Sequence, residues 1–141
     1  MPGRHGAYAA DLSQISDWSP TLVISMVETA EFASKGAASF GGDLLASGIQ
    51  WRHVPVPDFG VPATLNWSDL CNDVLVRLRS GESVLIHCMG GCGRSGMIAL
   101  RLMIAAGEPA DAALLRLRKT RPCAIETMAQ MTWAMQDVGS T

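Results

Sequence analysis

The chain has 141 residues, of which 48% are hydrophobic, and it carries a formal net charge of −2. This length suits one domain, residues 1–141, and the apolar content is sufficient for a core, which excludes a disordered chain. The small negative charge gives no electrostatic attraction to nucleic acid or to an anionic membrane. We therefore expect a single compact domain that binds neither.

The first six residues contain no apolar signal region, and the longest apolar segment, residues 96–107, is too short to cross a bilayer. An even number of cysteines is present: Cys71, Cys88, Cys92 and Cys123. Disulfides are one interpretation of an even count, but nothing in the sequence indicates an oxidising compartment. We expect reduced thiols in a cytoplasmic protein.

The first predicted strand covers residues 21–27, which are rich in β-branched side chains and follow a proline. Residues 28–47 are rich in alanine and glycine and predict helix that is broken near Gly36 and again at Gly41 and Gly42. The second strand is expected at residues 49–56, where prolines indicate that it either ends there or lies at a sheet edge.

Residues 57–62 contain further prolines and predict a loop. Apolar residues at helical spacing predict a helix over residues 66–80, with Asn66 or Ser68 as its N-cap. The third strand is expected at residues 83–87.

Three helices are predicted after that strand, at residues 95–106, 109–119 and 126–138. The first of them is almost wholly apolar, which indicates burial on nearly all sides. Strands that alternate with helices predict an α/β domain, with a central, mostly parallel sheet flanked by helices.

A glycine-rich loop joins the third strand to the apolar helix, and residues 87–96 read His-Cys-Met-Gly-Gly-Cys-Gly-Arg-Ser-Gly. Its glycines allow successive backbone N–H groups to point inward, and the start of the helix adds its positive end. Arg94 adds a planar fork of donors suited to two phosphate oxygens. We expect a phosphate-binding cup formed by Met89, Gly90, Gly91, Cys92, Gly93 and Arg94.

Cys88 stands at the head of this cup, where the inward N–H groups, the helix start and Arg94 together favour the negatively charged thiolate over the thiol. A thiolate at the base of a phosphate site is placed for in-line attack on phosphorus. Ser95 is expected to donate a hydrogen bond to the sulfur, mainly when the sulfur leaves a phosphocysteine intermediate. His87 is expected to hold the loop backbone by hydrogen bonds rather than to act as a base.

The leaving oxygen of a phosphate ester needs a proton, and Asp58 is the candidate general acid. It lies in a proline-restrained loop that follows a strand, from where it can overhang the cup. Taken alone, an Asp before Phe-Gly is a turn residue; taken with the cup, it favours catalysis. Phe59 is either part of the pocket wall or a core residue.

Residues 87–95 match the pattern His-Cys-(five residues)-Arg-Ser/Thr and so resemble the cysteine-dependent protein tyrosine phosphatase superfamily. The glycine loop and residues 56–62 are most similar to its small dual-specificity, kinase-associated-phosphatase-like group. The resemblance implies Cys88 as nucleophile, Arg94 as phosphate clamp, Asp58 as general acid and Ser95 as thiolate partner. It also implies a reaction without a metal or an organic cofactor.

A third segment, residues 121–130, resembles the superfamily loop Arg-Pro-Gly-x-Val-Gln-Thr-x-x-Gln. In the classical enzymes the first Gln of that loop positions water for the second step. Glu126 occupies this place here, while Gln130 matches the second Gln. Glu126 therefore either orients water or pairs with a nearby arginine, or it simply stands in the favourable first turn of a helix.

The resemblance implies a protein phosphatase that acts on phosphotyrosine, with phosphoserine and phosphothreonine as further candidates. Met89 and Cys92 stand where the phosphoinositide branch has lysines, which disfavours a highly charged inositol lipid. The expected partner is a phosphorylated protein or peptide, and we expect a monomer. The alternatives are a phosphoprotein-binding module with the same but catalytically weak loop, and a sulfur-transfer or arsenate-reducing enzyme.

Oxidation chemistry gives the cysteines a second set of interpretations. Cys92, Cys71 or Cys123 is a candidate to trap oxidised Cys88 as a disulfide. Separate thiols are the favoured interpretation.

Overall fold

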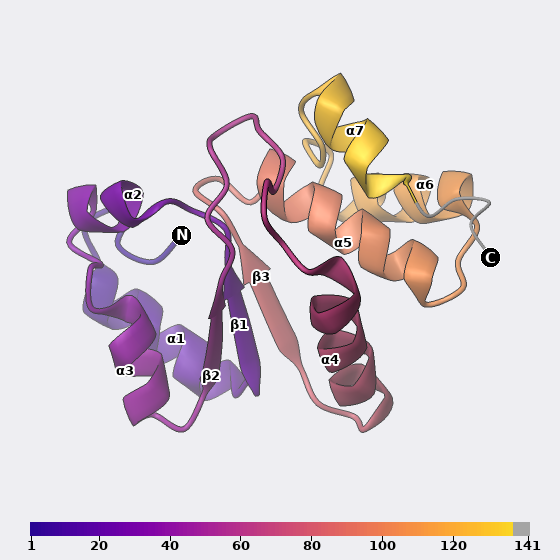
Figure 1. The fold of residues 1–141 in the computed structure, drawn as a ribbon. Coiled ribbons are helices and arrows are strands. Elements are labelled where there is room, and N and C mark those ends of the chain that lie inside the picture. Colours follow the sequence, from indigo (N-terminus) through magenta and orange to yellow (C-terminus); the bar gives the residue numbers. More distant parts are fainter. Residues whose placement is uncertain (137–141) are drawn as a thin grey trace.

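The computed structural model describes residues 1–136. Helices and strands alternate along the chain, as Figure 1 shows, with these bounds: α1 (Tyr8–Trp18), β1 (Leu22–Ser25), α2 (Thr29–Ser34), α3 (Phe40–Ala46), β2 (Gln50–His53), α4 (Trp67–Arg79), β3 (Val84–His87), α5 (Gly93–Ala105), α6 (Ala110–Thr120) and α7 (Met128–Ala134).

The strands form one parallel sheet in the order β2-β1-β3, and all residues of the central strand β1 are buried. Ser25 at the end of β1 is in register with His53 of β2 and His87 of β3. Because parallel strands share one carboxyl edge, the segments that follow all three strands emerge on the same side of the sheet. This topology brings together α2, the loop after β2 and the loop after β3.

Helices α1, α2 and α3 lie on one side of the sheet, and α4, α5, α6 and α7 lie on the other (Figure 1). Helix α5 is the most buried of them, and its buried residues include both Arg94 and Ser95. The expected burial of the apolar helix is therefore confirmed, and so is the single α/β domain with a parallel sheet. In residues 1–136, no helix has the length and apolarity needed to cross a bilayer.

The early part of the chain departs from expectation in two places. Helix α1 was not predicted, because its apolar positions Tyr8, Leu12 and Ile15 are few and only partly buried. The chain breaks near Gly36 (φ +68°) as expected, but Gly41 lies inside α3. Its helix packs against an indole ring, and an added Cβ on Gly41 would stand 2.3 Å from atoms of Trp51. Gly41 thus serves close packing rather than a break.

The boundaries of the later elements agree more closely with the sequence. Asn66 is the N-cap of α4, since its side chain accepts a hydrogen bond from the amide of Asp69, and the alternative cap Ser68 lies inside the helix. Strand β2 ends at His53 and also lies at the sheet edge. The last helix was expected to reach residue 138, but α7 ends at Ala134, and positions 137 and 138 lie outside the described residues.

Candidate active site

Cys88 follows directly after β3 and is 3% exposed, at the base of the glycine-rich loop. Its Sγ lies 3.3 Å from the Ser95 hydroxyl oxygen. Burial by itself raises the pKa of the Cys88 thiol, but hydrogen bonds from the Ser95 hydroxyl and from the amides of Ser95, Gly91 and Cys92 outweigh it. The pKa therefore lies below its ordinary value, and the loop stabilises a thiolate.

Arg94 reaches the same loop from the first turn of α5, and its side chain is 1% exposed. Its Nη1 donates to a carboxylate oxygen of Glu31 (2.7 Å) and to the carbonyl of Val56 (3.0 Å), while Nη2 donates to the other Glu31 oxygen (2.9 Å). Among the described residues, no hydrogen bond uses the N–H of Nε or the second N–H of Nη2. These two groups share one edge of the guanidinium and are left for a bidentate anion.

Glu31 is the functional residue that sequence reasoning missed. It belongs to α2, and its carboxylate also accepts from the amide of Glu28 (2.7 Å) as part of a capping box. The hydrogen bond from Arg94 lowers the pKa of Glu31, so the pair is ionised at neutral pH. The available sequence signal was a Glu-x-x-Glu spacing at a helix start, which indicates a capping box but does not indicate that Glu31 also pairs with Arg94.

The loop after β2 brings Asp58 over the cup. Its Oδ1 lies 3.6 Å from Nη2 of Arg94 and accepts a hydrogen bond from the amide of Phe59. A cavity of about 250 Å³ opens between this loop and the glycine loop, lined by Arg4, Asp58, Phe59, Met89, Gly90, Cys92 and Glu126. Phe59 is 57% exposed at this mouth, so the core alternative for it is wrong.

His87 lies behind the loop rather than in it. Its Nδ1 is 3.2 Å from the Cys88 carbonyl and its Nε2 is 2.6 Å from the Ser25 hydroxyl, which accepts from the Trp51 indole. Burial lowers the pKa of His87 to about 4, so the ring is neutral at pH 7. A neutral ring with Nδ1–H donating to Cys88 and Nε2 accepting from Ser25 satisfies every one of these contacts.

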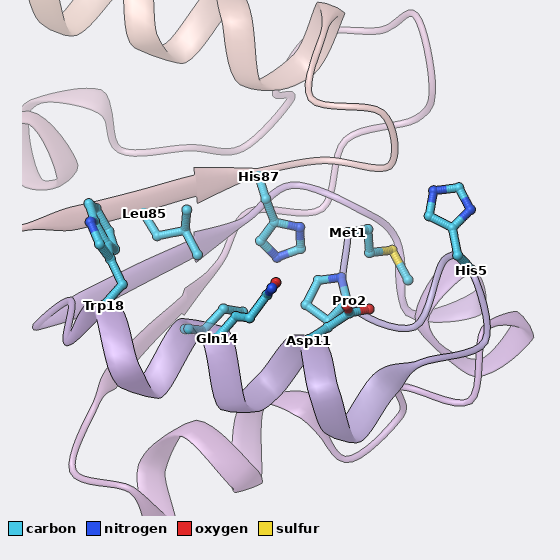
Figure 2. A pocket seen from close by; sticks show the side chains of 9 residues that line it. Met1, Pro2, His5, Asp11, Gln14, Trp18, Leu85 and His87 are labelled. Atoms are coloured by element: carbon cyan, nitrogen blue, oxygen red, sulfur yellow. The ribbon is translucent and has the colours of Figure 1, made fainter.

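A second cavity, of about 360 Å³, lies between α1 and β3 and is shown in Figure 2. His87 from the strand and Gln14 from α1 point into it from opposite sides (Figure 2). Leu85 and Trp18 close its other end. Unlike the smaller mouth cavity, it borders neither Asp58 nor residues 89–92 of the glycine loop, so the mouth cavity is the candidate site for phosphate.

The segment after α6 contacts the glycine loop. Glu126 accepts a hydrogen bond from the amide of Gly93 (2.9 Å), and no arginine among residues 1–136 forms an ion pair with it. Gln130 is buried; its Oε1 accepts from the amide of Glu126 (2.9 Å) and its Nε2 donates to the carbonyl of Gly60 (3.1 Å). Gln130 thereby joins the start of α7 to the loop that carries Asp58.

The expectation of reduced thiols is wrong for two of the four cysteines. Cys92 and Cys123 form a disulfide, with their Cα atoms 5.1 Å apart. The sequence could not show this pairing, because it depends on the fold placing the loop after β3 beside the loop after α6. Cys71 is a buried thiol, and Cys88 is the other cysteine outside the disulfide. In the described part of the chain, no group of three His, Cys, Asp or Glu side chains could hold a metal ion.

Solved structures resemble this fold over the whole chain. The structure described as Tk-PTP in the active form has a TM-score of 0.80 and 30% sequence identity, and the match covers 100% of this chain and 89% of that chain. Kinase-associated phosphatase with its catalytic cysteine replaced by serine has a TM-score of 0.85 at 20% identity, over 100% of this chain and 85% of that one. The second likeness shows a shared fold.

Curated relatives match over a shorter segment. Cyclin-dependent kinase inhibitor 3 of Sus scrofa is 32% identical over 89 residues, which are 61% of this chain and 42% of that protein. Protein tyrosine phosphatase domain-containing protein 1 of Bos taurus is 33% identical over 88 residues, 62% of this chain and 11% of that protein. The chain thus spans less than half the length of these relatives.

A family model described as "Polymorphic toxin system, DSP-PTPase phosphatase" matches residues 1–108. The matched residues include Glu31, Asp58, Cys88, Arg94 and Ser95 but end before Cys123. The chain belongs to this family of cysteine-dependent dual-specificity and tyrosine phosphatases.

Proposed function

We propose that the protein hydrolyses phosphomonoesters on proteins, with phosphotyrosine as substrate and phosphoserine and phosphothreonine as further substrates, through a phosphocysteine intermediate. One observation carries this proposal: a buried cysteine with a lowered pKa stands among hydrogen-bond donors, beside an arginine with one donor edge that makes no hydrogen bond to the described residues. That combination provides a nucleophile and an anion clamp in one place.

In the first step, the Cys88 thiolate attacks phosphorus while Arg94 and the loop amides hold the equatorial oxygens. The P–O bond to the substrate breaks, and Asp58 gives its proton to the leaving oxygen. In the second step, water attacks the phosphocysteine, the Asp58 carboxylate takes a proton from that water, and inorganic phosphate is released. The Ser95 hydroxyl stabilises the departing thiolate.

The supporting residues act through position. His87 positions the backbone of the loop by a hydrogen bond to the Cys88 carbonyl. Gln130 positions the loop that carries Asp58 by a hydrogen bond from α7 to the Gly60 carbonyl. Glu126 holds the amide of Gly93, and its carboxylate also borders the mouth, from where it can orient the attacking water. Phe59 forms one wall of that mouth.

The sequence carries no recognisable loop that would deepen the mouth, which favours substrates of different side-chain length over phosphotyrosine alone. Among the described residues that line the mouth, Arg4 is the cationic one. A phosphorylated protein is the proposed partner, and the family description places its members in polymorphic toxin systems. Action in the cytoplasm, as a monomer, without nucleic acid or membrane, stays a prediction.

Phosphate release from matched phosphotyrosine and phosphothreonine peptides tests the proposal, with Cys88→Ser as control. Comparable release from both peptides is expected, and the variant should lose turnover by at least about 10⁴-fold while it still binds phosphate. Release from phosphotyrosine alone would restrict the substrate class. Binding of phosphopeptide without release by the unmodified protein would replace the enzyme with a binding module.

A further inference from the structure

The phosphate-binding loop is rich in glycine where its shape matters most. Residues 90–93 read Gly-Gly-Cys-Gly, and Gly91 has φ +73°, in the left-handed region. Such a sequence reaches the required backbone conformation easily but leaves it easily as well, since glycine has large conformational freedom. The anion site therefore depends on whatever holds these residues from outside.

Every residue of this stretch is held by the segment 121–126. Arg121 donates to the carbonyls of Gly90 and Gly91, the latter at 3.0 Å. The amide of Ile125 donates to the carbonyl of Cys92 (3.3 Å), and Glu126 accepts from the amide of Gly93 (2.9 Å). We call residues 121–126 the brace.

The brace has one covalent member, the Cys92–Cys123 disulfide, which spans 31 positions of sequence. Cys92 lies in the middle of the loop, and its amide is one of the groups that stabilise the Cys88 thiolate. Cys123 is exposed, so a reductant can reach the bond from the brace side. Two of the other brace contacts, the hydrogen bonds from Arg121, lie at the surface, where water competes with them.

We propose that the Cys92–Cys123 disulfide is a positioning element that sets the affinity of the loop for phosphate monoesters, high when oxidised and low when reduced. Reduction by a dithiol breaks the S–S bond, gives two thiols on the protein and converts the dithiol to its cyclic disulfide. The loop then gains conformations in which the amides of Gly91 and Cys92 no longer point at the anion. The inference rests on the proposed function only in that the loop binds phosphate.

Thermodynamic linkage supplies a signature that a merely structural disulfide would lack. If the oxidised loop binds phosphate more tightly by some factor, phosphate must make the disulfide harder to reduce by the same factor. The ratio of reduced to oxidised dithiothreitol at half-reduction should therefore rise in saturating phosphate. A disulfide that only stabilises the fold would change the melting temperature without this dependence on phosphate.

The test uses the full chain carrying Cys88→Ser, so that the Cys88 thiol cannot exchange with the disulfide and no turnover is needed. Calorimetric titration with inorganic phosphate should show an affinity at least about fivefold lower after reduction. The Cys92→Ser/Cys123→Ser pair, placed in the same background, should bind as the reduced form does and should not respond to dithiothreitol. The Cys71→Ser variant in this background should respond as its parent does, because Cys71 lies outside the brace.

The outcomes separate the two proposals. Equal phosphate affinity in both redox states, or a half-reduction ratio that phosphate does not change, would overturn the role of the disulfide and leave the phosphatase proposal standing. Absence of phosphate binding in either state would overturn the anion-binding function of the loop and this inference with it. Thiol-specific mass labelling before each titration verifies which redox state is measured.

Discussion

The two sides of the active site differ in how firmly they are held. On the nucleophile side, Arg94 is 1% exposed and fixed by Glu31 and by the Val56 carbonyl. On the acid side, the Asp58 side chain is 56% exposed, and its loop is tied to α7 through the carbonyls of Phe59 and Gly60. The proposed anion site is thus built before substrate arrives, whereas the proposed acid stands on a more exposed loop that could adjust to substrate.

The sharpest way to test this difference is to remove the acid. Asp58→Ala should lower kcat/KM for an alkyl phosphate by about 10²-fold or more, because the leaving oxygen loses its proton donor. The alkaline limb of the pH–rate profile should flatten, because the variant no longer has a general acid at this position. The free energy of unfolding should change by less than about 0.5 kcal/mol, because the side chain is exposed.

Kinetics and denaturant unfolding of Asp58→Ala, beside the exposed control Asp17→Ala on α1, separate these effects. A phosphate with a good leaving group should be much less affected than an alkyl phosphate. An unchanged pH–rate profile would assign the acid role to another group, and Glu126 is the candidate because its carboxylate also lines the mouth.

On the nucleophile side, loss of Glu31 should lower stability as well as activity. Glu31→Gln removes the carboxylate that is hydrogen-bonded to the buried Arg94 guanidinium, which should lower the free energy of unfolding by about 3 kcal/mol. It should also lower kcat/KM by about 10-fold to 100-fold, because Arg94 is free to turn away from the substrate. Glu28→Gln, in the same capping box but without a contact to Arg94, is the matched control.

Acid titration of stability gives a second readout of the same pair. The Arg94 hydrogen bond holds the pKa of Glu31 below its ordinary value of 4.5, so the stabilisation is complete above that pH and is lost as the pH falls through the lowered pKa. The Glu31→Gln variant should therefore lose less stability than the parent as the pH falls below 4.5. Equal acid sensitivity, together with full activity, would mean that Arg94 is held without Glu31.

A smaller effect is expected when the thiolate loses its hydroxyl donor. Ser95→Ala removes one of the groups that lower the pKa of Cys88, so this pKa should rise towards its ordinary value. The acid limb of the rate profile should move to higher pH, and kcat near neutral pH should fall several-fold with little change in KM. The pH dependence of alkylation by iodoacetamide measures the thiol directly, with Ser80→Ala at the end of α4 as control.

The parts of the fold that could be predicted are those encoded locally. The run of apolar residues before Cys88, the glycines after it and the apolar helix beyond determine a strand, a loop and a buried helix within one stretch of chain. The contact between Cys88 and Ser95 follows from that spacing, because both residues border the same tight loop. Asp58 could be predicted as a candidate for the same reason, because it lies in a proline-restrained loop directly after a parallel strand.

The residues that were missed depend on which segments the fold brings together. Glu31 and Arg94 are 63 positions apart and meet only because the ends of β1 and β3 share one sheet edge. The disulfide between Cys92 and Cys123 arises likewise from the loops after β3 and α6. No local sequence pattern at one member of either pair identifies the other member, so sequence periodicity could not predict these contacts.

The disulfide also changes what oxidation should do to the nucleophile. Peroxide converts the Cys88 thiolate to a sulfenic acid, which needs a nearby thiol to form a bridge with release of water. Cys92, the cysteine four positions away, is already bonded to Cys123. Mild peroxide should therefore add oxygen to Cys88 without creating an intramolecular bridge, as intact-mass and peptide mass spectrometry would show.

After prior reduction and removal of the dithiol, Cys92 becomes available and a Cys88–Cys92 bridge should appear. A bridge from Cys88 to Cys71 in the unreduced protein would contradict this expectation and make Cys71 the resolving thiol.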